Sequence, residues 1–296
     1  MPENQMGLFG GDWTEKKLSI LKKYLEAYVT ALSRQPFELL YIDAFAGTGY
    51  REVEESGHED GGGLFSELAD QERQMFLDGS ARIALKVKRP FHKYLFIEKS
   101  ARKCGELRNL KWEFGPLADR IQIENSDCNS YLRSFCRNTS WVRKRAVLFL
   151  DPFGMQVEWD TVQVVAQTHA IDTWILFPLG VAVSRLLKKD GNIPDKWRTC
   201  LTRVFGTDEW YDVFYQEVTR RGLLGDVTEV RKLCSFDTIA RYYNDRLGKV
   251  FLDVAPNPAQ LMNSRGNPLF LFCFAAGNQK GAPIAVEIAQ QILKGW

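Results

Sequence analysis

The chain has 296 residues, of which 45% are hydrophobic, and its 39 basic and 37 acidic side chains leave a net charge of +2. This length and apolar content suit one large α/β domain, or a domain with a sizeable insertion, and so small a net charge excludes no class of partner. No leader peptide and no bilayer-spanning apolar run is visible, so we expect a soluble, cytoplasmic protein. Six cysteines without a C-x-x-C pair and only three histidines argue against a structural metal site.

Strands and helices alternate along the chain up to Leu179. An amphipathic helix is predicted over 14–33, with Thr14 as its cap. The strands expected after it are 39–43, 93–98, 120–124, 146–151 and 172–177, and the helices among them are 80–87, 101–110, 129–136 and 161–168. Residues 50–79 lack a clear period and are predicted to form a long, partly mobile loop. The alternation predicts a right-handed parallel sheet with helices on both faces.

The pattern changes after Leu179. A helical insertion without strands is expected over 181–248, with helices at 181–187, 196–205, 208–220 and 236–247. Two late strands, 250–254 and 268–274, and a helix over 283–293 follow. Five parallel strands and a late strand pair are the layout of class I methyltransferases, in which the seventh strand runs antiparallel. We therefore predict an α/β, Rossmann-like single domain over 1–296 with a seven-stranded sheet.

The first strand ends in the most informative motif, YIDAFAGTG (41–49). Asp43 closes the apolar run, and Gly47 and Gly49 permit a tight turn at the sheet edge where doubly wound folds bind their ligands. The spacing is neither G-x-G-x-x-G nor a P-loop. An acid beside a glycine turn suits a ligand with a positively charged amino-acid end, such as S-adenosylmethionine. The alternative is an ordinary turn after a strand.

Four carboxylates, Asp43, Glu98, Asp127 and Asp151, lie at or just past the ends of successive strands. The carboxyl ends of parallel strands share one edge. Asp43 would face the methionine part of the cofactor, Glu98 would accept bonds from two ribose hydroxyls, and Asp127 with the Cys128 backbone would hold the adenine amine. The alternative is that such acids only cap the helices that follow them. The predicted cofactor site comprises Asp43, Phe45, Gly47, Thr48, Gly49, Glu98, Lys99, Asp127 and Cys128.

The fourth strand leads into Asp151-Pro152-Phe153-Gly154. Amine-directed methyltransferases place an acid or amide, a proline and an aromatic ring here, because an aryl amine is a poor nucleophile. A carboxylate and a backbone carbonyl accept its N–H bonds and aim the lone pair at the methyl group. Pro152 would hold the turn and Phe153 would stack on a flipped base. The alternative is a plain Pro-Gly turn.

Several segments together resemble the three-Cys-motif partner proteins (TcmP). They are YIDAFAGTG (41–49), GSARIAL (79–85), YLFIE (94–98), FLDPFG (149–154) and PLFLFCFAAGNQKG (268–281). The resemblance runs from about Thr14 to the C-terminal helix. It implies a fold like that of class I methyltransferases and a phage-type Gp37/Gp68 protein as partner, to which the three cysteines of the name belong.

Two enzyme families are more weakly similar. The rRNA adenine-N6 methyltransferases share an N-terminal helix and an acidic second strand, but carry D-P-P-Y where this chain has Phe153 and Gly154. The string D-P-F-G itself resembles that of tRNA guanine-N2 dimethyltransferases. By this similarity Lys17 and Ser80 are expected to approach the cofactor or the target amine.

Three functions are compatible with these features. The first is an S-adenosylmethionine-dependent N-methyltransferase acting on an exocyclic amine, with a nucleic-acid base (RNA or DNA) as the expected target. The others are a non-catalytic, methyltransferase-like protein that binds another protein, and a small-molecule methyltransferase.

Basic clusters can hold phosphates or be plain solvated helix faces. Ten basic residues between 82 and 111 stand against Glu98 and Glu106, and a second set comprises Arg185, Lys188, Lys189, Lys196, Arg198 and Arg203.

Overall fold

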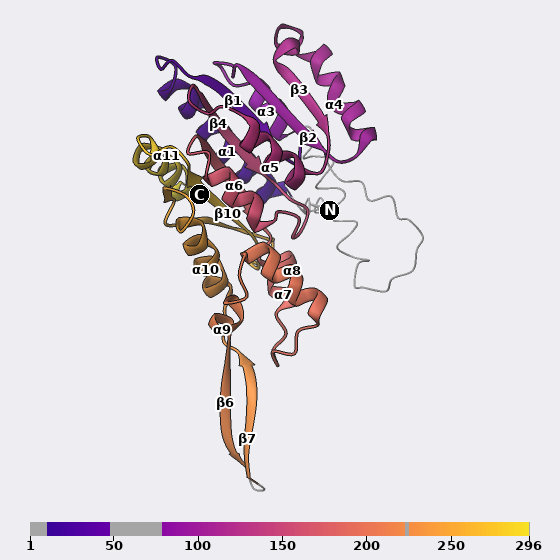
Figure 1. Cartoon of the computed structure of the whole chain (residues 1–296), viewed down its shortest axis with the longest axis vertical. Coiled ribbons are helices and arrows are strands. Elements are labelled where there is room, and N and C mark those ends of the chain that lie inside the picture. Colours follow the sequence, from indigo (N-terminus) through magenta and orange to yellow (C-terminus); the bar gives the residue numbers. More distant parts are fainter. Residues whose placement is uncertain (1–10, 48–78, 223–224, 296) are drawn as a thin grey trace, which may run out of the picture.

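A computed structural model of the chain describes residues 11–47, 79–222 and 225–295 (Figure 1). Thr48, Gly49 and nearly all of the predicted loop 50–79 lie outside these residues. The centre is an eight-stranded sheet with the order β3-β2-β1-β4-β5-β10-β8, and β9 pairs with β10. Its strands are β1 (Glu38–Asp43), β2 (Lys93–Glu98), β3 (Ile121–Asn125), β4 (Lys144–Leu150), β5 (Ile171–Phe177), β8 (Asp253–Val254), β9 (Ala259–Met262) and β10 (Pro268–Ala276).

The strand directions agree with the predicted layout. β1 to β5 are mutually parallel where they pair, whereas β10 runs antiparallel to β5 and β8. The predicted number of seven strands is wrong. The Pro/Asn/Gly-rich connection before β10 contains the short strand β9, which doubles back onto β10. The predicted strand over 250–254 is reduced to the two residues of β8.

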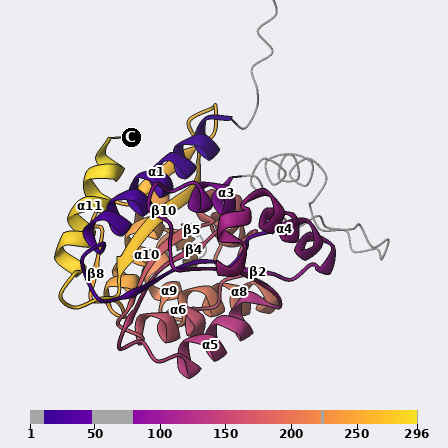
Figure 2. The ribbon, with the colours of Figure 1, turned by 90° about the horizontal axis from the view of Figure 1, so that it is seen from above.

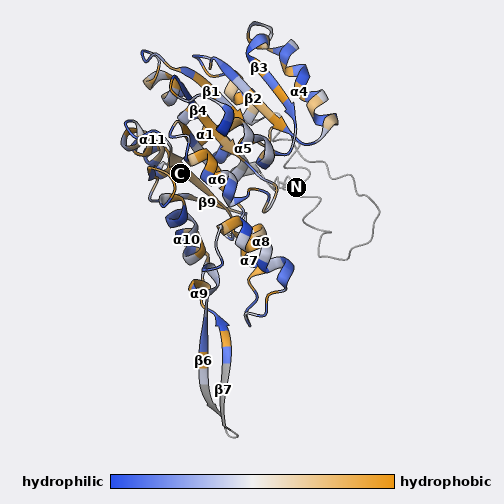
Figure 3. Cartoon of the chain, in the orientation of Figure 1, coloured by the Kyte–Doolittle hydropathy of each residue, from blue (hydrophilic) through white to orange (hydrophobic). Residues whose placement is uncertain are grey.

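Helices cover both faces of the sheet (Figure 2). Successive residues of a strand point to opposite faces, so Leu40 and Ile42 of β1 pack into one hydrophobic core and Leu39 and Tyr41 into the other. In Figure 3 such apolar strand residues appear as orange stretches along the sheet. One face is covered by α1 (Gly11–Ala31), α3 (Ser80–Leu85), α4 (Ala101–Glu113) and α11 (Ala282–Lys294), and the other by α5 (Cys128–Asn138), α6 (Trp159–Ala166), α8 (Asp195–Phe205) and α10 (Phe236–Gly248).

The region between β5 and β10 is not purely helical, so the expectation of an insertion without strands is wrong. A π-helical turn (Leu179–Val183), α7 (Ser184–Leu186), α8 and α9 (Trp210–Phe214) are followed by the antiparallel hairpin β6 (Tyr215–Gly222) and β7 (Gly225–Lys232). The predicted helix over 208–220 thus ends early. Its second half contains β-branched residues at Val218 and Thr219, which favour a strand. The hairpin extends away from the body of the molecule (Figure 1).

No helix among the described residues combines the length and apolar character needed to cross a membrane.

Candidate functional site

The carboxyl ends of β1, β2 and β4 form one edge of the sheet, and the segment after β1 is held between the two neighbouring strands. The Ala44 amide donates to the Phe149 carbonyl of β4 at 3.1 Å, and the Ala46 amide donates to the Ile97 carbonyl of β2 at 3.1 Å. These bonds carry the chain from Asp43 across to Gly47, beside Glu98. The topology thereby brings the predicted motifs of three strands to the same rim.

Asp43 lies fully buried under this segment. Its carboxylate accepts hydrogen bonds from the Phe45 amide at 3.3 Å and the Tyr41 hydroxyl at 3.4 Å, and it also bonds to the Ser80 side chain. Burial raises the pKa of Asp43 to about 7, and the nearby negative charge of Asp151 adds to this effect. The carboxyl group is therefore surrounded by groups of the chain itself, and it is protonated in part of the molecules at neutral pH.

Asp151 forms a buried ion pair with Lys17 of α1. Lys17 Nζ lies 3.1 Å from Asp151 Oδ2, the Lys17 side chain is fully buried and the Asp151 side chain is 10% exposed. The ammonium group also lies 5.2 Å from the centre of the Trp13 ring and 5.9 Å from that of Phe149. Burial raises the pKa of Asp151, whereas Lys17 lowers it by charge and by hydrogen bonding. Lys17 thus supports the ionised form of a carboxylate that retains a small opening to solvent.

Glu98 ends β2 and lies directly against Gly47. A Cβ added to Gly47 would come within 2.5 Å of Glu98 Oε2, so only glycine allows this approach. The carboxylate accepts a bond from the Ser100 amide at 2.7 Å. Burial raises its pKa, while bonds from the Ser100, Gly47 and Lys99 amides and the charge of buried Lys103 lower it.

Asp127 serves as the cap of α5. Its Oδ1 accepts from the Asn129 and Ser130 amides, each at 3.1 Å. Asp127 therefore caps the helix that follows it, and its role in binding a cofactor stays a prediction. Cys128 is buried, and burial raises the pKa of its thiol to about 12. The thiol is therefore neutral, so its contribution to a cofactor site would come from the backbone, as predicted.

The turn after Asp151 exposes its aromatic ring. The Phe153 side chain is 47% exposed, and its amide donates to Gln156 Oε1 at 2.9 Å. Gly154 has a φ of 68°, a conformation that glycine adopts at little cost. Two residues that the sequence reasoning missed shape this turn: Gln156, and the buried Asn129, which donates to the Gln156 carbonyl at 2.8 Å.

The predicted site residues are thus only partly gathered. Asp43 with Ser80 and Asp151 with Lys17 lie close enough for the carboxylates to influence each other electrostatically. Phe45 contributes its amide to Asp43 and is half-buried, whereas Lys99 is exposed. The similarity predicts only that Lys17 approaches the cofactor or the target amine. Its ion pair with Asp151 is not predicted from the sequence, and Trp13 beside it carries no sequence signal.

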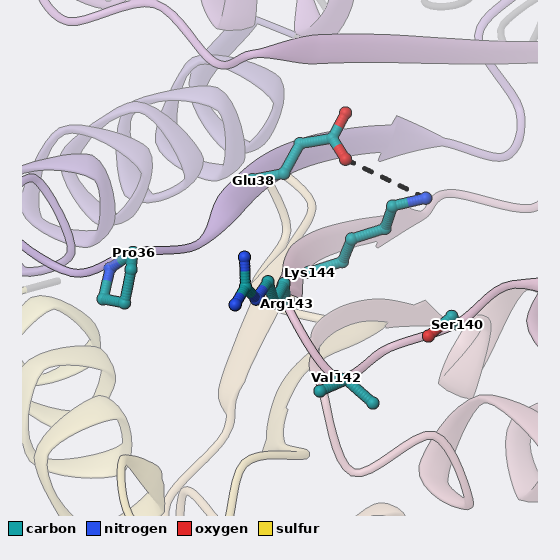
Figure 4. Close-up of a pocket in the computed structure, with 6 residues that line it drawn as sticks. All are labelled: Pro36, Glu38, Ser140, Val142, Arg143 and Lys144. Atoms are coloured by element: carbon teal, nitrogen blue, oxygen red, sulfur yellow. Dashed lines mark ion pairs between the residues drawn. The ribbon is translucent and has the colours of Figure 1, made fainter.

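A surface hollow lies at the opposite edge of the sheet (Figure 4). It measures about 680 Å³ and is lined by Pro36, Glu38, Ser140, Val142, Arg143 and Lys144. These residues precede or begin β1 and β4, and Glu38 pairs with Lys144 at 3.9 Å. The hollow is therefore distinct from the rim that carries Asp43 and Asp151.

No protein-family model and no curated protein matches the chain, so the resemblance to three-Cys-motif partner proteins stays a prediction. Among solved structures, protein LPL1258 from Legionella pneumophila is 11% identical with a TM-score of 0.43, and the match covers 97% of this chain and 93% of that one. A Listeria monocytogenes protein provisionally described as an S-adenosylmethionine-dependent methyltransferase is 10% identical with a TM-score of 0.33, covering 86% of this chain and 98% of its own. These likenesses are too distant to assign a family or an activity.

Proposed function

We propose that the chain is an S-adenosylmethionine-dependent N-methyltransferase that acts on an exocyclic amine of a nucleic-acid base. The observation that carries this proposal is the arrangement at the end of β4. There a nearly buried carboxylate, Asp151, is held by Lys17 at 3.1 Å and is followed by Pro152 and the exposed ring of Phe153. A carboxyl group that can accept a hydrogen bond, next to an exposed ring, suits a planar aryl amine.

The close approach of Glu98 to Gly47 supports a cofactor at this rim. A Cβ on Gly47 would collide with the Glu98 side chain, so glycine lets the acid at the end of the second strand lie against the turn after β1, where it would be placed to bind ribose hydroxyls. Asp127 Oδ2 would accept from the adenine amine. Asp43 would contribute indirectly, from below the turn that leads to Gly47. Its bonds to the Phe45 amide and the Tyr41 hydroxyl shape that turn.

The chemistry needs little from the protein beyond positioning. S-adenosylmethionine, when bound, would supply an electrophilic methyl carbon, whose bond to the sulfonium sulfur breaks as the N–C bond forms and leaves a neutral thioether. Asp151 would accept one N–H of the amine, so that the nitrogen lone pair lies along the line of attack. Lys17 would favour the ionised form of that carboxylate and hold it in place, and Phe153 would stack on the ring that carries the amine. After transfer, nitrogen releases one proton to solvent.

The test has two stages. Calorimetric titration with S-adenosylmethionine should show binding, and transfer of radiolabelled methyl to total RNA or DNA should follow. Asp151→Ala should retain cofactor binding and lose transfer, whereas Asp160→Ala, at an exposed acid of α6, should change neither. Undiminished transfer by Asp151→Ala would remove Asp151 from the mechanism. A partner that co-purifies stoichiometrically, with no transfer to any substrate, would favour the non-catalytic alternative.

A further inference from the structure

The outer side of α4 presents an indole ring to solvent. Trp112 is 88% exposed, more than any other large hydrophobic residue in the described part of the chain. Arg108 lies one helical turn before it on the same face, and Arg108 and Lys111 are both exposed. At the other end of the helix, next to Glu98, Lys99 and Arg102 are exposed as well. We call Lys99, Arg102, Arg108, Lys111 and Trp112 the α4 face. They spread over the solvent-exposed half of the helix and the residues just before it, with Arg102 and Lys111 on its two flanks.

Positive charge dominates around this ring. The acids of α4 are Glu106 and Glu113, and Glu113 Oε2 is engaged by Arg82 of α3, with Nη2 at 2.9 Å and Nε at 3.2 Å. The same contact ties α3 to the end of α4, which lie beside each other in Figure 2. The turn that follows α3 adds three more exposed cations, Lys86, Lys88 and Arg89.

The chemistry of this surface favours nucleic acid over protein as its partner. Lysine is depleted from protein–protein interfaces, whereas four of the seven exposed cations named here are lysines. Exposed aromatic rings among cations are the arrangement that binds single strands, because bases stack on the rings while the cations contact phosphates. A base within a duplex is already stacked on both sides, so a single-stranded segment suits Trp112 better.

We propose that the α4 face binds single-stranded nucleic acid, with Trp112 stacking on a base and the surrounding Lys and Arg side chains contacting phosphates. α4 has 13 residues and is therefore about 20 Å long. It begins three residues after Glu98, so a strand on this face runs towards the candidate site. That direction rests on the proposed function, but the binding itself does not.

The experiment measures the affinity of the purified full-length chain for fluorescein-labelled 12-nucleotide oligo(dT) and oligo(U) by anisotropy over a series of salt concentrations. Trp112→Ala should weaken binding about fivefold or more, because stacking contributes about 1–3 kcal/mol per base. The exposed Val142→Ala is the matched control and should leave binding unchanged. Arg108→Glu/Lys111→Glu should weaken binding and reduce the slope of log K against log salt by about 1.4, for two lost contacts to a single strand.

Lys196→Glu/Arg203→Glu changes net charge equally at exposed positions of α8 and should leave that slope unchanged. If the two double variants weaken binding equally, the loss is explained by net charge alone, and the proposal is overturned. So would unchanged affinity of Trp112→Ala, or a wild-type chain that binds neither probe at low salt. A Trp112→Ala effect confined to self-association, read by size-exclusion chromatography, would likewise overturn it. Intact binding without any methyl transfer would instead contradict only the proposed function.

Discussion

Lys17 and Asp151 stand 134 residues apart in the sequence, and their side chains meet at 3.1 Å beneath the end of β4. The pair joins α1, which covers one face of the sheet, to the turn that is proposed to hold the target amine. Because the Lys17 side chain is fully buried and Asp151 retains 10% exposure, a substrate would meet the carboxylate and not the ammonium group. Lys17 is therefore a positioning residue for Asp151.

Lys17→Met should destabilise the fold and shift the pH dependence of transfer. Removing one partner of a buried ion pair costs about 3 kcal/mol, and the pKa of Asp151 should rise because its nearby cation is lost. Transfer should fall at neutral pH and recover in part at higher pH, while Lys17→Arg should retain more activity. Urea unfolding and radiolabelled transfer over a pH series measure both effects. Lys22→Met, at an exposed position of the same helix, is the control, and an unshifted pH profile would contradict the assigned role.

The contribution of Asp43 to the free energy of unfolding should decrease as pH rises from mildly acidic to neutral. Its pKa is raised from 3.8 to about 7 in the folded state, so between these values the folded chain binds more protons than the unfolded chain. Its contribution is fully present below pH 3.8 and is lost as pH rises through about 7, a difference of about 4 kcal/mol. Asp43→Asn should flatten this part of the curve of unfolding free energy against pH. Asp160→Asn, at the surface, should leave the curve unchanged, and an equally steep curve for Asp43→Asn would assign the pH dependence to other groups.

The strands near the site could be predicted because their signals are local. Apolar runs that end in Asp43 and Glu98 place β1 and β2 correctly to within one residue, and parallel topology then brings their ends to one rim. The capping of α5 by Asp127 is equally local, since the bonded amides lie two and three residues ahead.

The remaining features depend on tertiary contacts. The burial of Asp43 arises from Tyr41, Ser80 and the turn over it, and no spacing rule indicates that a strand-end acid will be enclosed. The hairpin was missed because Tyr215–Gly222 reads as a continuation of α9, and its strand pairing depends on residues up to Lys232. The helical preference of this segment is overridden there by pairing with β7, which lies later in the sequence.

Gly47→Ala should weaken S-adenosylmethionine binding without unfolding the chain. The new Cβ would meet Glu98 Oε2 at 2.5 Å, Cγ at 2.7 Å and Cδ at 2.8 Å, so the carboxylate must move from its place at the end of β2. We expect an affinity loss of about tenfold or more, equivalent to about 1.4 kcal/mol, measured by calorimetric titration. Gly105→Ala is the matched control, because a Cβ there meets nothing within 4 Å and alanine favours the helix. If Gly47→Ala and wild type bind S-adenosylmethionine with equal affinity, Glu98 does not hold the cofactor.

Phe153→Ala should reduce transfer to nucleic acid while leaving cofactor affinity and stability unchanged. The ring is 47% exposed, so its loss leaves no cavity in the core, and its proposed task is to stack on the target base. Stacking contributes about 1–3 kcal/mol per base, which predicts a drop in kcat/KM of about tenfold. Phe153→Tyr keeps an aromatic face and should retain most of the activity. Val213→Ala removes a side chain of similar exposure, 48%, from α9 and should have no effect. Equal transfer by Phe153→Ala and Phe153→Tyr would mean that the base is held by other groups, because aromatic character is the property in which these two variants differ most.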